Sequence, residues 1–314
     1  MNRRLFLTSL AAVGATIAAP VRSDRISMAA WSLNRSFFAA HRWTNLDLPR
    51  VVREEFGLGA VELVNQFFEN PRLGYLQKLK RNGEQNGVDF VLIMVDGEGD
   101  MSAVSKQERL QAAVAHRKWV DAAHFLGCHA IRCNMGGPRQ NWQADHDIVE
   151  RAAESFSNLL DYSKESGINI VIENHGGASS DRNVLPKLMK TVNHPRFGTL
   201  PDFGNMNPGD DNAEVIRAIL PWAKGISVKA AWASDGTHPT FDLEGLLKLC
   251  VASGFHGYWG IESSFGRRGP NPIENPTDDQ IWETETKGVQ LTKAMIEKVV
   301  LKTNSGNFGG SVNA

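Results

Sequence analysis

The chain has 314 residues, of which 42% are hydrophobic and 22% are charged. This length and composition exclude a disulfide-stapled mini-protein and a disordered protein, and they leave room for two ordinary domains or one large barrel. The formal net charge is -1, from 34 Lys and Arg against 35 Asp and Glu, which gives no electrostatic reason to expect nucleic acid or an anionic membrane as a partner.

Residues 1–25 differ from the rest of the chain. Arg3 and Arg4 stand near the start, and a run of apolar and small residues follows as far as Ala19. A basic start, an apolar core too short to span a bilayer and small residues at its end are typical of a signal peptide, and the paired arginines resemble a twin-arginine export signal. We therefore predict export by the twin-arginine machinery to the bacterial periplasm or beyond. A chance basic start on a buried helix is the alternative.

From residue 26 to residue 302, short apolar runs alternate with amphipathic helical patterns. Each run is nearly continuously apolar, as expected for strands that are covered on both faces. The clearest helical stripes cover Gln107–Leu126 and Val149–Ser166, and each ends at a glycine. The predicted strands are Ile26–Ser32, Gly59–Val64, Val88–Val95, Cys128–Asn134, Ile168–Glu173, Phe197–Asp202, Gly225–Ala230 and Gly257–Glu262.

Eight strands, each followed by a helix, predict an α/β fold with a single (β/α)8 TIM barrel. An open doubly wound sheet is the alternative, but it would need a Gly-rich phosphate turn after an early strand, and the sequence has none there. Residues 303–314, rich in Gly, Ser and Asn, are predicted to be a flexible tail. No stretch after the signal is long and apolar enough to be a predicted membrane span.

Polar residues end or follow all eight predicted strands, and carboxylates end the fifth, sixth and eighth. These are Glu173, Asp202 and Glu262. Because side chains alternate along a strand, each can point into the barrel mouth, where barrels of this type place their chemistry. Converging carboxylates repel unless a cation is present, and oxygen ligands favour Mg²⁺ or Mn²⁺. Separate salt bridges to barrel arginines and lysines are the alternative.

Three motifs carry a family resemblance: Glu-Asn-His-Gly-Gly at 173–177, Pro-Asp-Phe-Gly-Asn at 201–205 and Gly-Ile-Glu at 260–262. They resemble the xylose-isomerase-like superfamily of sugar isomerases and epimerases, over nearly the whole chain after residue 26. The resemblance implies a TIM barrel with one divalent ion, usually manganese or magnesium. Carboxylates after strands five, six and eight and a histidine after strand seven would hold that ion, and the three carboxylates of this chain match.

The fourth ligand does not match. Lys229 stands where the resemblance implies a histidine, and a protonated lysine cannot ligate a cation. Three alternatives are open: His175 completes the metal shell, water or substrate fills the place, or the Lys229 ammonium replaces the metal.

The resemblance also implies the chemistry, which is movement of a proton at the carbon next to a sugar carbonyl. Glu173 and Glu262 would be the acid–base pair, and the ion or Lys229 would stabilise the enediolate oxygen. Two alternatives are a lyase or dehydratase that abstracts the same proton from a keto-sugar or 3-keto-glycoside, and a non-catalytic sugar-binding barrel. Export favours a free sugar or glycoside over a sugar phosphate.

Five further residues are candidates for binding the carbohydrate. Arg132 and Asn134 share the parity of the fourth strand, so both can reach the mouth. Asn205 can contact the metal shell or a sugar hydroxyl, or form a turn. Trp31 and Trp232 lie near strand ends and can stack on a sugar ring, although core filling is the stronger interpretation for Trp31. A homo-oligomer is compatible with the sequence.

Overall fold

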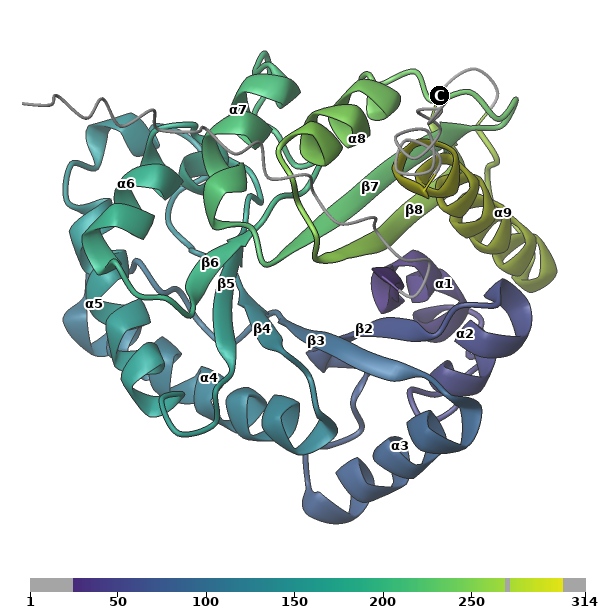
Figure 1. The fold of residues 1–314 in the computed structure, drawn as a ribbon, viewed down its shortest axis with the longest axis horizontal. Coiled ribbons are helices and arrows are strands. Elements are labelled where there is room, and N and C mark those ends of the chain that lie inside the picture. Colours follow the sequence, from purple (N-terminus) through teal and green to yellow (C-terminus); the bar gives the residue numbers. More distant parts are fainter. Residues whose placement is uncertain (1–24, 269–271, 302–314) are drawn as a thin grey trace, which may run out of the picture.

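Strands and helices alternate along the chain in the computed structural model, which describes residues 25–268 and 272–301. The strands surround a common centre, and the helices lie outside them (Figure 1). The predicted export signal, apart from residue 25, and the predicted tail at 303–314 lie outside the described residues. Among the described helices, none combines the length and the apolar character that crossing a membrane requires.

All pairings between neighbouring strands are parallel, in the order β6-β5-β4-β3-β2-β1-β8-β7. Two parallel bridges, Thr199 with Ala223 and Asp202 with Ser227, join the ends of this sheet and close the barrel. The strands are β1 (Ile26–Ala29), β2 (Ala60–Val64), β3 (Asp89–Val95), β4 (Ala130–Cys133), β5 (Asn169–Glu173), β6 (Phe197–Leu200), β7 (Gly225–Ala233) and β8 (Tyr258–Arg268). The predicted single TIM barrel is therefore confirmed.

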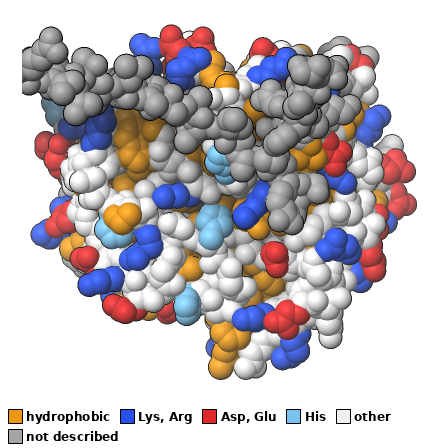
Figure 2. Space-filling model, viewed as in Figure 1, with side chains coloured by type: hydrophobic (Ala, Val, Ile, Leu, Met, Phe, Trp, Pro, Cys, Tyr) orange, Lys and Arg blue, Asp and Glu red, His pale blue; other side chains and the backbone are white. Residues whose placement is uncertain are grey.

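The α-helices lie around the strands, with α1 nearest the centre of the view in Figure 1. They are α1 (Asn34–Phe38), α2 (Leu48–Phe56), α3 (Leu73–Asn86), α4 (Lys106–Leu126), α5 (Ile148–Tyr162), α6 (Val184–Val192), α7 (Asn212–Ile219), α8 (Leu243–Ala252) and α9 (Asp278–Ile296). Short 3-10 turns follow several strands, among them Ala30–Leu33 after β1. On the face drawn in Figure 2, acidic and basic side chains are interspersed around the edge.

Local sequence explains the ends of the longest helix. The Ser105 side chain accepts a hydrogen bond from the backbone N–H of Glu108 at 3.3 Å, which caps the start of α4. Gly127 ends α4 with a φ of 85°, a left-handed conformation that glycine adopts without steric cost. The predicted bounds of this helix differ from the observed bounds by one residue at its start.

Strands β7 and β8 are longer than their apolar runs predict. The predicted strands end at Ala230 and Glu262, whereas the observed ones continue to Ala233 and Arg268. Beyond the barrel mouth these two strands pair only with each other, so their backbone groups stay hydrogen-bonded without neighbours on the other side. A polar run such as Ser263-Ser264 gives no apolar signal for this extension.

The barrel interior is polar as well as apolar. Core residues such as Ile261 and Trp259 are fully buried, yet Ser27, Glu62 and Arg132 are also at most 2% exposed. Buried charges persist in proteins only when they are paired or hydrogen-bonded. The barrel therefore places a set of compensating charges beneath its mouth.

Candidate active site at the barrel mouth

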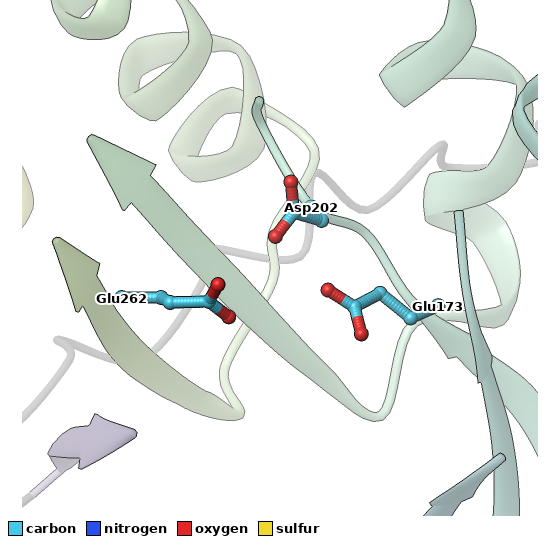
Figure 3. Close-up of side chains that lie close together, drawn as sticks. All are labelled: Glu173, Asp202 and Glu262. Atoms are coloured by element: carbon cyan, nitrogen blue, oxygen red, sulfur yellow. The ribbon is translucent and has the colours of Figure 1, made fainter. Parts of the chain in front are cut away.

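Three carboxylates converge where β5, β6 and β8 end or pass the mouth (Figure 3). Glu173 is the last residue of β5, Asp202 lies two residues beyond β6, and Glu262 lies within β8. Each offers an oxygen within 4.8 Å of the other two. The structure therefore brings together the three carboxylates that strand parity predicted to point into the barrel mouth.

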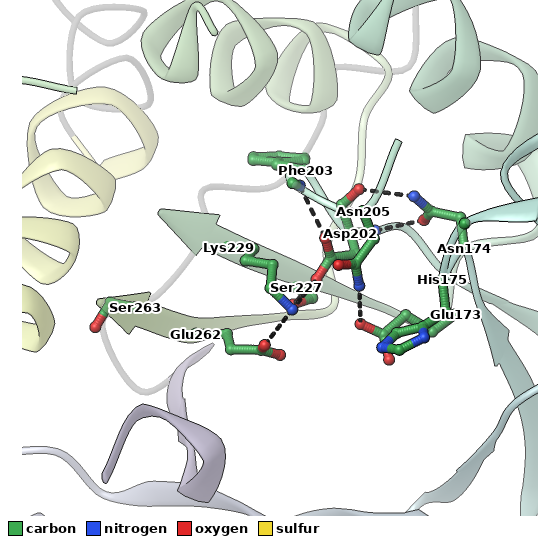
Figure 4. A network of polar contacts seen from close by, with 12 residues as sticks. Glu173, Asn174, His175, Asp202, Phe203, Asn205, Ser227, Lys229, Glu262 and Ser263 are labelled. Atoms are coloured by element: carbon green, nitrogen blue, oxygen red, sulfur yellow. Dashed lines mark hydrogen bonds and ion pairs between the residues drawn. The ribbon is translucent and has the colours of Figure 1, made fainter. Parts of the chain in front are cut away.

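Asp202 is the most tightly held of the three. Its Oδ2 accepts a hydrogen bond from Oγ of Ser227 at 2.8 Å, and its Oδ1 accepts one from the backbone N–H of Gly204 at 2.8 Å. The side chain of Asn174 bonds both backbone groups of Asp202, at 2.7 and 2.9 Å. Burial raises the pKa of Asp202 well above its usual range; Lys229 opposes this shift, and the neighbouring carboxylates add to it. Figure 4 shows this network.

Glu173 lies between an amide and a guanidinium. Nδ2 of Asn205 donates to its Oε1 at 3.2 Å, and Nε of Arg132 lies 2.9 Å from its Oε2. The second contact is an ion pair without the alignment of a hydrogen bond, because neither of those two atoms has a hydrogen-bond partner. Burial raises the pKa of Glu173, against the attraction of Arg132. The carboxyl groups of Glu173 and Asp202 thus favour the protonated form more than solvent-exposed carboxyl groups do.

Lys229 brings a positive charge into this group. Its Nζ contacts Oε1 of Glu262 and lies 3.8 Å from Oδ2 of Asp202 (Figure 4). Strands β7 and β8 pair so that Lys229 of β7 lies directly opposite Glu262 of β8. Burial lowers the pKa of the amine, but the attraction of three carboxylates outweighs this and raises it overall. The lysine is therefore a cation and a poor nucleophile.

Arg132 and Asn134 both contact Asp96, the residue that follows β3. Nη1 of Arg132 lies 2.6 Å from Oδ1 of Asp96, and Nδ2 of Asn134 donates to the same oxygen at 2.7 Å. Arg132 thus bridges Asp96 and Glu173, whereas the hydrogen bond of Asn134 is to Asp96 and not to the three carboxylates. Both residues support the site from the β3–β4 side.

His175 is not part of the carboxylate group. Its Nδ1 lies 3.2 Å from Nη2 of Arg139, and its carbonyl accepts from Nη1 of the same arginine at 3.1 Å. Burial and the nearby cations lower the pKa of the imidazole. The proposed metal-ligand role of His175 stays a prediction that these contacts do not favour.

A cavity of about 450 Å³ adjoins the carboxylates, and its lining includes Lys229, Glu262, Asn205 and Trp31. Trp232 does not line it. The indole is 5% exposed, and its Nε1 donates to Oγ1 of Thr292 on α9 at 2.8 Å. Residues three apart on a strand face opposite sides, so Trp232 and Lys229 cannot share the barrel mouth. A larger hollow of about 1640 Å³ lies between α7 and α8 and contains none of the predicted site residues.

Sequence reasoning missed Glu62. This residue of β2 is 1% exposed, and its Oε1 accepts a hydrogen bond from Oγ of Ser27 at 2.7 Å. Burial, with a further contribution from Glu262, raises its pKa to about 7, although Ser27 and Arg132 favour the charged form. The signal was present in the sequence, because Glu62 interrupts an apolar strand at its centre.

The carboxylate group is suited to a hard divalent cation. Three oxygens lie within 4.8 Å of one another, and Oε2 of Glu173 is buried without a hydrogen-bond partner. Carboxylate oxygens are the ligands that Mg²⁺ and Mn²⁺ prefer. Lys229 competes for the same oxygens through its contact with Glu262. The residues present therefore fit a divalent ion, provided that the ion replaces Lys229 as the partner of the Glu262 carboxylate.

Comparison with known proteins gives the family. Residues 52–284 match the model of the xylose isomerase-like TIM barrel family, so the chain belongs to that family. No curated protein matches the sequence.

Solved structures of similar fold include three with informative names. One is a 3-keto-D-glucoside 4-epimerase from E. coli, at 14% identity over 89% of this chain and 99% of that chain, with a TM-score of 0.61. A second is a D-allulose 3-epimerase from Methylomonas sp., at 14% identity over 90% and 99%, with a TM-score of 0.65. A third is a xylose isomerase-like TIM barrel protein from Mycobacterium smegmatis in complex with magnesium, at 14% identity over 91% and 99%, with a TM-score of 0.64. At these identities the likeness is one of fold.

Proposed function

We propose that the protein is an exported carbohydrate isomerase or epimerase that moves a proton at the carbon next to a sugar carbonyl. The observation that carries this proposal is the meeting of Glu173 and Glu262 at the barrel mouth with a lysine cation between carboxylates. Proton transfer next to a carbonyl needs an acid, a base and a positive group for the developing oxyanion, and these residues supply all three. Family membership and the sugar epimerases among the structural neighbours support the same class of reaction.

Environment distinguishes the two glutamates. Glu173 is fully buried with a raised pKa, so it is suited to hold a proton and deliver it. Glu262 keeps an ion pair with Lys229, and its side chain is 13% exposed, so it is suited to accept a proton from a substrate in the cavity. In this proposal the reacting carbon of the sugar lies between the two glutamates and presents one face to each. Removal from one face and return to the other gives epimerisation.

The chain's own cations orient the oxygen on which charge develops. The Lys229 ammonium reaches both Glu262 and the cavity, so it can donate a hydrogen bond to that oxygen. Arg132 holds Glu173 in place from beneath. A divalent ion, magnesium or manganese, held by Glu173, Asp202 and Glu262 would polarise the carbonyl and stabilise the same negative charge when bound.

Exchange of substrate α-protons with deuterated water tests the proposal. We expect Glu173→Gln and Glu262→Gln to lower the exchange rate by roughly 10² to 10⁴, the usual range for loss of a general acid or base. Glu55→Gln, on the exposed side of α2, is the matched control and should exchange at the parental rate. Exchange at the parental rate in both site variants would overturn the proposal.

Two other outcomes identify the alternatives. Products of unchanged mass indicate isomerisation or epimerisation, whereas loss of water or of an alcohol indicates the lyase reaction on a keto-glycoside. Binding of a sugar without proton exchange in the parent protein indicates a non-catalytic barrel.

A further inference from the structure

The cavity beside the carboxylates extends along the paired ends of β7 and β8. Its lining includes Glu262 and Arg267, which lie five residues apart on β8. Gly266, with a φ of 66°, interrupts the extended backbone between them, so this wall is shorter than the roughly 16 Å of a fully extended run. At about 450 Å³ the cavity has the size that proteins use for ligands larger than one hexose.

Two aromatic side chains line the cavity, and each is supported from behind. Trp31 packs edge-on against Phe67, with ring centroids 5.4 Å apart. Phe241 packs against His238 at 4.6 Å, and His238 in turn packs against Trp232 at 5.4 Å. Such supported rings offer rigid apolar faces at little entropic cost, which suits the C–H face of a sugar ring. Trp232 thus acts here by supporting another aromatic residue.

Polar groups complete this outer part of the cavity. Asn34 and Asn212 add carboxamides to its lining, and Arg267 adds an exposed guanidinium. Amides and guanidinium groups hydrogen-bond hydroxyl and ring oxygens. Aromatic faces and hydrogen-bonding groups thus line the same cavity as Glu262.

We infer that the cavity contains an outer subsite for a second hydroxylated ring, formed by Trp31, Phe241 and Arg267, so that the substrate is a disaccharide-like glycoside whose reacting ring lies at the carboxylates. This inference rests on the proposed function and adds the substrate class. The outer subsite binds the second ring, and the carboxylates act on the first.

The test uses a matched pair of compounds with the same reacting ring, 3-keto-glucose and 3-keto-cellobiose. We expect kcat/KM for deuterium exchange to be about tenfold or more higher for the two-ring compound. Trp31→Ala, Phe241→Ala and Arg267→Ala should reduce this advantage, with a larger loss for the two-ring than for the one-ring compound. Trp31→Phe should restore most of it. Arg182→Ala, a change at an exposed arginine that pairs with Glu214 and does not line the cavity, is the control and should leave both values unchanged.

Equal kcat/KM for the two compounds, or equal losses for both in the variants, would overturn the outer subsite while leaving the proposed reaction intact. If neither compound exchanges protons in the parent protein, the proposed function fails. The outer subsite is then tested separately, by measuring the affinity of the two-ring compound by calorimetry. In that case a two-ring compound that binds about tenfold more weakly to Trp31→Ala than to the parent supports it, and equal affinities refute it.

Discussion

Glu62 is one of the buried carboxyls that we expect to make the stability of this barrel depend on pH. Glu62 has a pKa of about 7 in the folded chain, against a usual value of 4.5 in an unfolded one. The folded state therefore favours the neutral form, so its contribution to stability is complete below pH 4.5 and is lost as the pH rises through 7. A shift of this size corresponds to about 3 kcal/mol.

We expect Glu62→Gln to be more stable than the parent by up to about 3 kcal/mol at pH 8, and no more stable at pH 4.5. The amide keeps an oxygen that can accept the hydrogen bond from Ser27 and cannot become charged. Urea unfolding at the two pH values measures this. Glu55→Gln, exposed on α2, should follow the parental pH profile. A constant difference between Glu62→Gln and parent at both pH values would show that folding does not raise the pKa of Glu62.

We expect Lys229 to lower the affinity of the three carboxylates for a divalent cation. Its ammonium already neutralises part of their charge, and a divalent ion about 4 Å from it would be repelled by about 2 kcal/mol even at the dielectric constant of water. We expect Lys229→Met to bind Mn²⁺ roughly thirtyfold more tightly than the parent, as measured by titration calorimetry. Lys229→Arg keeps the charge and should not gain affinity. Equal affinities in the parent and Lys229→Met would mean that the amine leaves the site when metal enters.

At the scale of elements, the barrel closes where β6 meets β7, and close packing there depends on a glycine. A Cβ on Gly198 would lie 2.6 Å from the carbonyl oxygen of Trp222 and 2.7 Å from Cγ of Lys224, both in the segment that leads into β7. The backbone oxygen cannot move without opening the junction. This junction is joined by isolated bridges, whereas the other neighbouring strands are joined by ladders of two or more consecutive pairs.

We expect Gly198→Ala to lower the free energy of unfolding by about 1 to 3 kcal/mol, the usual cost of overpacking. Gly74→Ala in α3 is the control, because a Cβ there meets nothing within 4 Å, and it should leave stability unchanged or slightly higher. Chemical unfolding of both variants measures the difference. Equal stability of Gly198→Ala and parent would show that the β6–β7 junction can widen to accept a methyl group without loss of stability.

The extension of β7 and β8 is the second feature at this scale. These strands pass the level at which the others end, and they carry Lys229 and Glu262 at the mouth and Arg267 beyond it. The same pair of strands thus supplies the ion pair of the site and one wall of the cavity. Figure 1 shows them as the longest arrows of the barrel.

At the scale of the whole molecule, the near-neutral charge and the predicted export signal support our proposal that the substrate is an uncharged sugar outside the cytoplasm. The proposed export depends on the arginine pair. We expect the double change Arg3→Lys, Arg4→Lys to leave most of the protein in the cytoplasm, as measured by fractionation of bacterial cells that express the full chain. Arg22→Lys, a conservative change outside the pair, should not alter the periplasmic fraction. Unchanged export of the double variant would rule out the twin-arginine route.

The sequence by itself determined the barrel and its three carboxylates. Apolar runs with glycine-ended helices between them carry the (β/α)8 pattern, because strand and helix periodicities are local properties of the chain. Strand parity then predicts that Glu173, Asp202 and Glu262 point into the barrel mouth, and in the structure their oxygens lie within 4.8 Å of one another.

Only the tertiary structure decided which charges meet. Lys229 pairs with Glu262 because β7 and β8 align in one register, and Glu62 is buried because the barrel closes over it. The support that Trp232 gives to the cavity through His238, and the length of β7 and β8, also depend on contacts between distant segments. Register and closure are set by packing across the whole sheet, and no local pattern of residues carries that information.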